Sequence, residues 1–415
     1  MRASWILLTS LILLSACSDT FRSTNNLAYL YKKEKTSLHP NFKIYHKNDS
    51  ISELHFSMHS EELLYVRNPS NNTFTARVGL SYKLFTSYQS NELVDSAAVV
   101  LRDENPKQVE KYIQGKLDIK IPRGKFILKL STTDLNKNRL EHNFLEVDKI
   151  DQMSDQNFLV RDAETKRVLY TAFVSIGQKL VIEYNKKSID QLQGSYYDRI
   201  FQMPPPPFAS YNQQSFDYTS DSSFVYTIGE TFEVPRSGFY HFSPSTQRKA
   251  GLSLFQFTEL FPYLKTIEDL LYPMRFIMSR KDFEFLYKAG NQRASVETFW
   301  TEASGNRTKA RSLIEQYYSR VENANYHFSS HLEGWKTDRG MIYLIFGQPN
   351  IIYRTGGSET WIYGVESNQL SLNFVFVKLI NPFTDNHFVL NRSPIYKNPW
   401  YRAVDEWRAG RAYNL

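Results

Sequence analysis

Apolar and polar residues alternate along much of the chain that follows the N-terminal segment. Every second residue is apolar from Val78 to Leu84, and the same period returns in Leu117–Ile121 and in Phe126–Leu130. A period of two places successive side chains on opposite faces of a β-strand, so each segment predicts a strand with one buried face. Pro122–Gly124 separates the last two segments and predicts a turn. Residues 41–148 are therefore expected to form an antiparallel, immunoglobulin-like β-sandwich.

Residues 149–250 also have the pattern of a β domain. Phe158–Val160 and Val168–Val174 flank a polar turn, which predicts a hairpin. The corner Val234–Phe239 has the same plan as Ile121–Phe126, with a proline and a glycine between two apolar segments. We therefore expect a second sandwich of similar plan. Because Pro/Gly corners are common where strands reverse, this repeated corner leaves open whether the two sandwich domains arose by duplication.

After about residue 251 the period lengthens from two to 3.6. Apolar residues recur at helical spacing from Ala310 to Phe328, which predicts one amphipathic helix that Asn306 or Thr308 can cap. Further elements are expected as shorter helices at Thr266–Phe276 and Ser279–Tyr287, and as strands at Met341–Phe346, Thr360–Tyr363 and Leu372–Ile380. Residues 251–415 thus predict an α+β domain.

The first 16 residues have the pattern of a secretion signal. Arg2 precedes an apolar core, Trp5–Leu14, that is too short to span a bilayer stably. The next residues complete a Leu-Ser-Ala-Cys sequence that resembles the lipobox of bacterial lipoproteins and implies attachment of diacylglycerol to Cys17. Cys17 is the only cysteine, which leaves none for disulfides or thiolate chemistry. We expect a signal peptide in 1–16 and a polar, lipid-anchored tether in 17–40 on the outer membrane, with periplasmic and surface exposure both open.

Composition gives little support to a nucleic-acid partner. The formal net charge is +7, but lysine and arginine are spread along the chain among 43 acidic residues, as on an ordinary solvated surface. Aromatic residues make up 15% of the chain, which suits β-sheets and contact surfaces. The balance therefore favours binding to other proteins weakly and excludes nothing else.

One segment between the long helix and the next predicted strand is distinctive. It reads Gly-Trp-Lys-Thr-Asp-Arg-Gly from Gly334 to Gly340, and Phe-Gly-Gln-Pro follows at Phe346–Pro349. It resembles the GWxTD domain proteins, found largely in Bacteroidota. The residues that carry the resemblance are Gly334, Trp335, Thr337, Asp338, Tyr343, Gly347, Pro349, Glu359, Trp361 and Tyr363. The resemblance covers roughly residues 272–363 and implies sandwich domains followed by this module.

The motif has a structural interpretation and a functional alternative. Gly334 and Gly340 permit positive φ, the motif tryptophan buries a large surface, and Thr337 and Asp338 can hydrogen-bond a tight turn. The alternative makes Asp338 and Arg339 an exposed binding pair. The resemblance implies no established reaction.

We expect no catalytic residue, no metal and no cofactor. The sequence contains no nucleophile elbow, phosphate-binding loop, dinucleotide fingerprint or zinc helix. His327 and His331 could share a metal with Glu333 or Asp338, but a helix C-terminus also favours histidine for its dipole. A carboxylate pair distant in sequence would escape this reasoning.

The expected function is a non-catalytic binding or scaffold subunit of an envelope complex, with an outer-membrane β-barrel machine for assembly, secretion or uptake as partner. Candidate contact residues are Trp400, Tyr401, Trp407 and Arg408, because these residue types dominate interface hot spots. Their alternative is packing on their own domain. The rival classes are a surface glycan-binding protein or glycan hydrolase, which needs an aromatic cleft with two convergent carboxylates, and a purely structural envelope protein.

Overall fold

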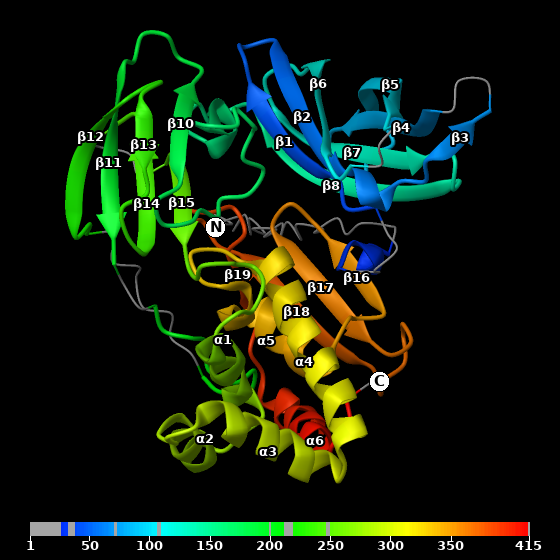
Figure 1. Cartoon of the computed structure of the whole chain (residues 1–415), viewed down its shortest axis with the longest axis vertical. Coiled ribbons are helices and arrows are strands. Elements are labelled where there is room, and N and C mark those ends of the chain that lie inside the picture. Colours follow the sequence, from blue (N-terminus) through cyan, green and yellow to red (C-terminus); the bar gives the residue numbers. More distant parts are fainter. Residues whose placement is uncertain are drawn as a thin grey trace, which may run out of the picture.

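The computed structural model describes residues 26–31, 38–69, 73–105, 109–198, 201–210, 219–245 and 250–413. Cys17, the expected signal peptide and much of the expected tether lie outside these residues. Two β-rich parts lie side by side, and a third part that combines helices with a sheet lies below both in Figure 1. The three parts meet at the centre of the molecule.

The N-terminal part is a pair of antiparallel sheets. One contains β1 (Asn41–His46), β2 (Ile51–His59) and β6 (Tyr112–Lys120); the other contains β3 (Val66–Asn68), β4 (Thr73–Phe85), β5 (Leu93–Glu104), β7 (Lys125–Asp134) and β8 (Arg139–Asp148). Leu54 and Ile119 of the first sheet share a core with Leu84 and Leu128 of the second. The predicted turn after β6 carries the chain from one sheet to the other. This part is therefore sandwich-like, as the alternating pattern predicts.

The central part repeats this plan. One sheet contains β9 (Phe158–Asp162), β10 (Lys179–Tyr184) and β13 (Thr231–Glu233); the other contains β11 (Gln191–Tyr197), β12 (Ser222–Thr227), β14 (Gly238–Ser243) and β15 (Leu252–Gln256). Ile182 of the first sheet and Leu192 and Phe242 of the second belong to one buried core. The second Pro/Gly corner joins β13 to β14, so it too links two sheets. Gly238 allows this corner because its φ is 117°.

The expected hairpin between Phe158–Val160 and Val168–Val174 is confirmed only beside its turn, where the Asp162 N–H donates to the Arg167 carbonyl at 2.9 Å and the Leu169 N–H donates to the Val160 carbonyl at 2.8 Å. β9 pairs with β10, and Val168 contributes only an isolated bridge to Arg161. The chain then leaves β9, because the backbone N–H of Val174 donates to the carbonyl of Phe255 in the other sheet at 3.0 Å. Leu169 and Val174 pack in the core of the central part, whereas Phe173 packs in a separate cluster with Phe255 and Phe383.

The C-terminal part combines six α-helices with one antiparallel sheet in the described residues. The helices are α1 (Ile267–Leu271), α2 (Arg280–Tyr287), α3 (Gln292–Ser304), α4 (Arg307–Phe328), α5 (Asp338–Phe346) and α6 (Lys397–Arg408). The strands are β16 (Ile351–Arg354), β17 (Ser358–Tyr363), β18 (Leu372–Lys378) and β19 (Phe388–Leu390). The predicted long helix is confirmed as α4, and the Asn306 side chain caps it by accepting from the Lys309 N–H.

The strand expected at Met341–Phe346 is wrong, because these residues lie in α5. Thr337 caps this helix by accepting from the Gly340 N–H at 3.1 Å. Every residue of α5 is buried. A helix buried on all sides carries no 3.6-residue period, so a short apolar run cannot be distinguished from a buried strand by pattern alone.

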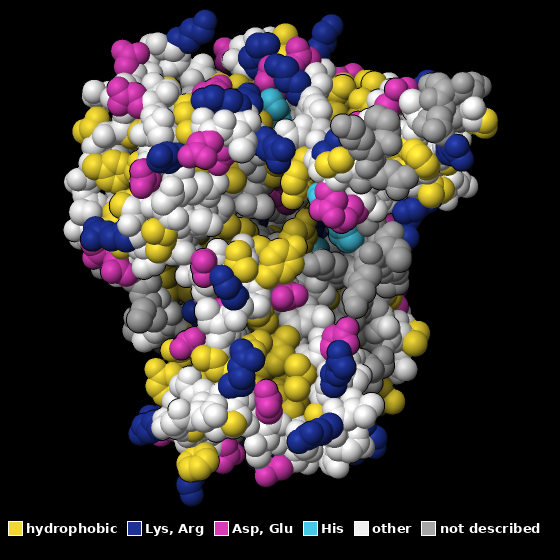
Figure 2. Space-filling model, in the orientation of Figure 1, with side chains coloured by type: hydrophobic (Ala, Val, Ile, Leu, Met, Phe, Trp, Pro, Cys, Tyr) yellow, Lys and Arg dark blue, Asp and Glu magenta, His cyan; other side chains and the backbone are white. Residues whose placement is uncertain are grey.

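Charged side chains are spread over the visible face of the molecule, and the described helices do not combine the length and the hydropathy of a membrane span. None of the helices in the described ranges is long and apolar enough to cross a membrane. Figure 2 shows lysine and arginine side chains interspersed with aspartate and glutamate over one face of the molecule. On this face the positive net charge is therefore not gathered into one patch, in keeping with the sequence interpretation.

Candidate functional site

The two motif glycines allow close packing of backbone on backbone. Gly334 lies in the 3-10 helix η5 (Gly334–Lys336), and a Cβ there would overlap the Ala324 carbonyl of α4. A Cβ at Gly340 would overlap the Gly334 carbonyl. Neither glycine is among the residues with positive φ. The expectation of positive φ is therefore wrong, and the absence of a side chain is what the fold requires at both positions.

Thr337 and Asp338 connect the motif to the rest of the domain. The Thr337 hydroxyl donates to the Gly334 carbonyl at 2.7 Å. The buried Asp338 carboxylate accepts from the Leu390 N–H at 2.9 Å and pairs with the Arg392 guanidinium at 3.1 Å. Asp338 therefore ties the start of α5 to β19 and is not accessible to a partner.

Arg339 is also buried, at 2% exposure, and it joins a network around Glu359. The Glu359 carboxylate, in β17, accepts from Arg339 at 3.1 Å and pairs with Arg354 at 2.7 Å. The Trp361 indole N–H donates to it at 3.0 Å. Burial raises the pKa of Glu359, but the two guanidinium groups more than offset this and lower it to about 2. The alternative of Asp338 and Arg339 as an exposed binding pair is thus excluded.

A short segment far away in sequence completes this network. Residues Ala28–Tyr31 form the 3-10 helix η1, and Leu27, Ala28 and Tyr31 are buried in the core of the C-terminal part. The Tyr31 hydroxyl donates to the Glu359 carboxylate oxygens at 2.9 and 3.0 Å. The sequence pattern had placed these residues in a polar tether. Their apolar side chains are instead an integral part of the C-terminal fold.

Replacing Tyr31 by phenylalanine tests this contact. The substitution removes a hydroxyl that donates to a buried carboxylate, so we expect the free energy of unfolding to fall by about 2 kcal/mol. Urea denaturation measures it, with Tyr29→Phe as the matched control because Tyr29 is 40% exposed. Equal stability of the two variants would mean that the segment is not docked in solution.

The other motif residues are also structural. Gly347 ends α5 with a φ of 81°, and the Tyr363 hydroxyl donates to its carbonyl at 2.7 Å. Pro349 is buried. The fully buried Trp361 ring packs against the Phe376 ring, with the two ring centroids 4.8 Å apart. The turn that follows α5 is therefore built as the family resemblance implies, although a helix rather than a strand precedes it.

The four candidate contact residues of the C-terminal tail divide into two pairs. Trp400 and Trp407 are buried, and the Trp407 indole N–H donates to the Ile345 carbonyl at 3.1 Å. Tyr401 is 49% exposed. Arg408 is also exposed, and its guanidinium lies 3.6 Å from the Asp282 carboxylate. The two tryptophans thus pack on their own domain, while Tyr401 and Arg408 remain accessible.

The motif also holds the loop between β18 and β19. Arg339 donates to the backbone carbonyl of Asn386 at 3.0 Å and to its side-chain oxygen. The Asn381 side chain lies 3.2 Å from the rings of both His331 and His387. Burial lowers the pKa of His331 to about 3 and that of His387 to about 4, so both rings are neutral at physiological pH. The loop is therefore positioned from the motif side of the domain.

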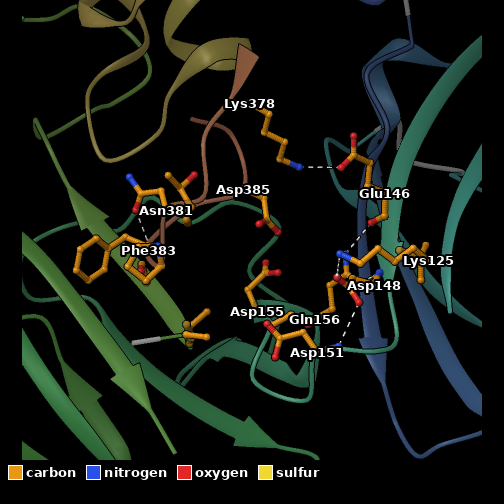
Figure 3. Close-up of a pocket in the computed structure, with 18 of the residues that line it drawn as sticks. Lys125, Glu146, Asp148, Asp151, Asp155, Gln156, Lys378, Asn381, Phe383 and Asp385 are labelled. Atoms are coloured by element: carbon orange, nitrogen blue, oxygen red, sulfur yellow. Dashed lines mark hydrogen bonds and ion pairs between the residues drawn. The ribbon is translucent and has the colours of Figure 1, made fainter. Parts of the chain in front are cut away.

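This loop forms one wall of a cavity where the three parts of the molecule meet. The cavity has a volume of about 1100 Å³. Figure 3 shows its charged lining residues, which come from all three parts. They are Lys43, Lys125, Glu146 and Asp148 from the N-terminal part, Asp151 and Asp155 from the connection into the central part, and Lys378 and Asp385 from the C-terminal part. Tyr88, Tyr170 and Phe383 add aromatic surface.

Ion pairs across the cavity hold its walls together. Lys378 pairs with Glu146 at 2.8 Å and joins the C-terminal and N-terminal parts. Lys43 pairs with Asp155 at 2.9 Å and joins the N-terminal and central parts. Each pair leaves oxygen and nitrogen atoms beside the cavity. The site therefore offers hydrogen-bond donors and acceptors in a partly enclosed space of ligand size.

Asp385 differs from the other lining carboxylates. Among the described residues it forms no ion pair, and in Figure 3 its carboxyl points toward Asp155. Burial by the surrounding walls raises the pKa of Asp385 to about 6, and the negative charge of Asp155 adds to this effect. Asp385 is exposed to solvent in the cavity, and the neighbouring charge of Asp155 favours its protonated form.

The pKa of Asp385 gives a pH-dependent prediction. Its folded value near 6 lies above the ordinary value of 3.8, so the folded protein holds this proton more tightly than the unfolded chain. The associated stabilisation is present below about pH 4 and is lost as the pH rises through 6. After allowance for solvent screening we expect about 1 kcal/mol.

Thermal unfolding between pH 4 and 8 measures this effect. In Asp385→Asn, the fall in stability between pH 4 and 6 should be smaller than in the unsubstituted protein. At pH 7.5 the variant should be more stable than the unsubstituted protein. A pH profile identical to that of the unsubstituted protein would contradict the raised pKa.

The histidines considered for a metal do not form a ligand set. His331 lies beyond the end of α4, and its ring makes an edge-to-face contact with the His387 ring, with the ring centroids 4.8 Å apart. Glu333 pairs with Lys336, and Asp338 pairs with Arg392. In the described ranges, the group with metal-ligating geometry is the partly exposed set His59, Glu61 and Glu110, whose ligand atoms lie within 4.8 Å of one another. It lies at the far end of β2, away from the cavity.

The fold and the motif define a class of protein: two sandwich-like β parts followed by a helical and β part that is built around the segment Gly334–Gly340. The family model of the GWxTD domain matches residues 238–409, so this part of the chain is a GWxTD domain. The match begins at β14, earlier than the resemblance to residues 272–363 suggested. No curated protein matches the chain.

Proposed function

We propose that the protein is a Bacteroidota-type outer-membrane lipoprotein, anchored through Cys17, that acts as a non-catalytic binding or scaffold subunit of an envelope complex. Its β-rich parts, 41–148 and 149–250, are proposed to be immunoglobulin-like domains, with the GWxTD domain from 251 onward. The proposed partner is an outer-membrane β-barrel machine for assembly, secretion or uptake.

The cavity between the three parts carries this proposal. No single part could present this surface, and Arg339 of the motif holds the loop that forms one of its walls, which supports the proposal. Asp338 and Arg339 are buried in internal contacts, which supports a structural use of the motif over a catalytic one. The exposed Tyr401 provides a second surface for a partner.

Site-directed crosslinking in the native organism tests the proposal. A photo-reactive amino acid replaces Thr384, which lines the cavity, or Val225, which is 62% exposed on β12. A C-terminal tag then recovers the protein in mild detergent. We expect one barrel protein to crosslink in near-stoichiometric amount from Thr384 and not from Val225. Equal crosslinking from both positions, or none from Thr384, would contradict the proposal.

Glycan binding or hydrolysis is the second candidate, favoured by the pair Asp385 and Asp155. Asp385, with its pKa near 6, could donate a proton as a general acid, while Asp155 is held by Lys43. Tyr88 and Tyr170 could contact sugar rings. Release of new reducing ends from polysaccharides measures hydrolysis. Loss of that activity in both Asp385→Asn and Asp155→Asn would establish this function, and no release by the unsubstituted protein would remove it.

A further inference from the structure

The chain enters the C-terminal part beside a particular loop. The Asn26 side chain donates to the Asn350 carbonyl at 2.8 Å and accepts from the Ile352 N–H at 3.0 Å, which fixes residue 26 at the start of β16. The Asn350 side chain in turn accepts from the Gly364 N–H at 2.8 Å. Gly364 begins the loop between β17 and β18. The incoming chain, β16 and this loop therefore meet at one end of the sheet.

The loop Gly364–Ser371 presents two apolar side chains to solvent. Val365 is 70% exposed and Leu370 is 88% exposed. The backbone around them is held by internal contacts: the Ser371 hydroxyl donates to the Val365 carbonyl at 2.6 Å, and the Leu370 N–H donates to the Asn368 side chain at 2.9 Å. Single exposed apolar side chains are common on protein surfaces, but these two belong to one short ordered loop and together offer an apolar contact to another surface.

The loop lies at the end of the sheet that is distant from the cavity. Gly356 and Gly357, in the turn between β16 and β17, line the cavity. β17 runs from that turn to Tyr363, so the loop that follows is at the opposite end of the strand. In Figure 1 the two β-rich parts lie beyond the cavity end of the sheet. The loop and the β-rich parts thus occupy opposite ends of the C-terminal sheet.

The length of chain before Asn26 limits where a membrane can lie. Asn26 is the ninth residue after Cys17, and nine residues span at most about 30 Å when fully extended. A lipid attached to Cys17 would therefore keep the bilayer within that distance of Asn26 and of the neighbouring loop. Together with the exposed side chains, this bound identifies the occupant of the apolar loop as a lipid surface.

We infer that the loop Gly364–Ser371 rests on the outer membrane, with the Val365 and Leu370 side chains among the lipid headgroups, and that the β-rich parts point away from the bilayer. This inference rests on the proposed anchor at Cys17. Two apolar side chains bind a bilayer weakly by themselves, but the anchor holds them close to it, as a linked second site does. The loop then sets the orientation of the protein rather than its attachment.

A fluorescent label on the loop tests the inference. The mature lipoprotein carrying Leu370→Cys is labelled with a polarity-sensitive dye and reconstituted into vesicles of phosphatidylethanolamine and phosphatidylglycerol. A lipid-modified Cys17 has no free thiol, so the dye reacts only at the new position. Val225→Cys is the matched control, because Val225 is also exposed and apolar but lies on β12.

We expect the emission at position 370 to shift to the blue and to be quenched by brominated lipids, with neither change at position 225. Emission from both positions typical of water would overturn the inference. Vesicle flotation and the mass of the N-terminal peptide test the anchor separately. If Cys17 carries lipid and the protein floats while position 370 stays in water, only the inference is wrong. If Cys17 carries no lipid, the anchor and the inference both fail.

Discussion

Replacing Glu359 by glutamine is expected to lower the free energy of unfolding by about 3–5 kcal/mol, because it leaves two buried guanidinium groups without a counter-charge. The carboxylate is fully buried and pairs with Arg339 and Arg354. Urea denaturation followed by tryptophan fluorescence measures the loss. The control is Glu259→Gln, which breaks an exposed pair with Lys265 and should cost less than about 1 kcal/mol.

Acid unfolding gives the same network a second test. The folded pKa of Glu359 is about 2, below its ordinary value of 4.5, so the ionised group stabilises the fold above pH 4.5. That stabilisation is lost as the pH falls from 4.5 towards 2. Glu359→Gln should therefore weaken the acid dependence of unfolding in this window. A steep acid transition of unchanged size in the variant would show that other carboxylates cause it.

Replacing Gly334 by alanine is expected to destabilise the protein by about 3 kcal/mol, because the new methyl group would overlap a backbone carbonyl that cannot rotate away. The contact is with the Ala324 carbonyl, close to the C-terminal end of α4. Thermal and urea unfolding measure the effect. Gly356→Ala is the matched control, since a Cβ there meets nothing within 4 Å and its φ is not positive.

The control should change stability by less than about 1 kcal/mol, and Gly340→Ala should resemble Gly334→Ala. Full stability of Gly334→Ala would mean that η5 can move away from α4. The backbone contact would then not be the reason for glycine in the motif.

The elements that the sequence predicts well are those with a single buried face. β4 and α4 each have a polar face, so their periods of two and 3.6 are visible in the chain. The α5 helix has no polar face, and its apolar run was taken for a strand. The sequence pattern does not predict α3 and α6 as helices, and it suggests the aromatic residues of α6 as contact candidates instead. Trp300 and Trp407 are in fact neighbours in the core.

The cavity could not be predicted in the same way. Its charged residues extend from Lys43 to Asp385, and no local spacing relates them. Asp385 lies in a loop without a regular period, and its raised pKa depends on walls from other parts of the chain. A carboxylate pair whose members are distant in sequence cannot be recognised from local spacing. The motif was found at once, but its connection to the loop through Arg339 and Asn386 required the structure.

The docking of Asn26–Tyr31 also bears on the order in which the parts of the chain fold. Ile352 and Asn26 are 326 residues apart, and Tyr31 and Glu359 are 328 apart. Contacts of such long range form late, because the chain between them must first be closed into a loop. The β-rich parts can fold as they emerge, whereas the last domain must wait for its final strands and then capture the first residues of the chain. Until then the core residues that bury Leu27 and Tyr31 remain uncovered. Chaperones and proteases can therefore compete with folding during this interval.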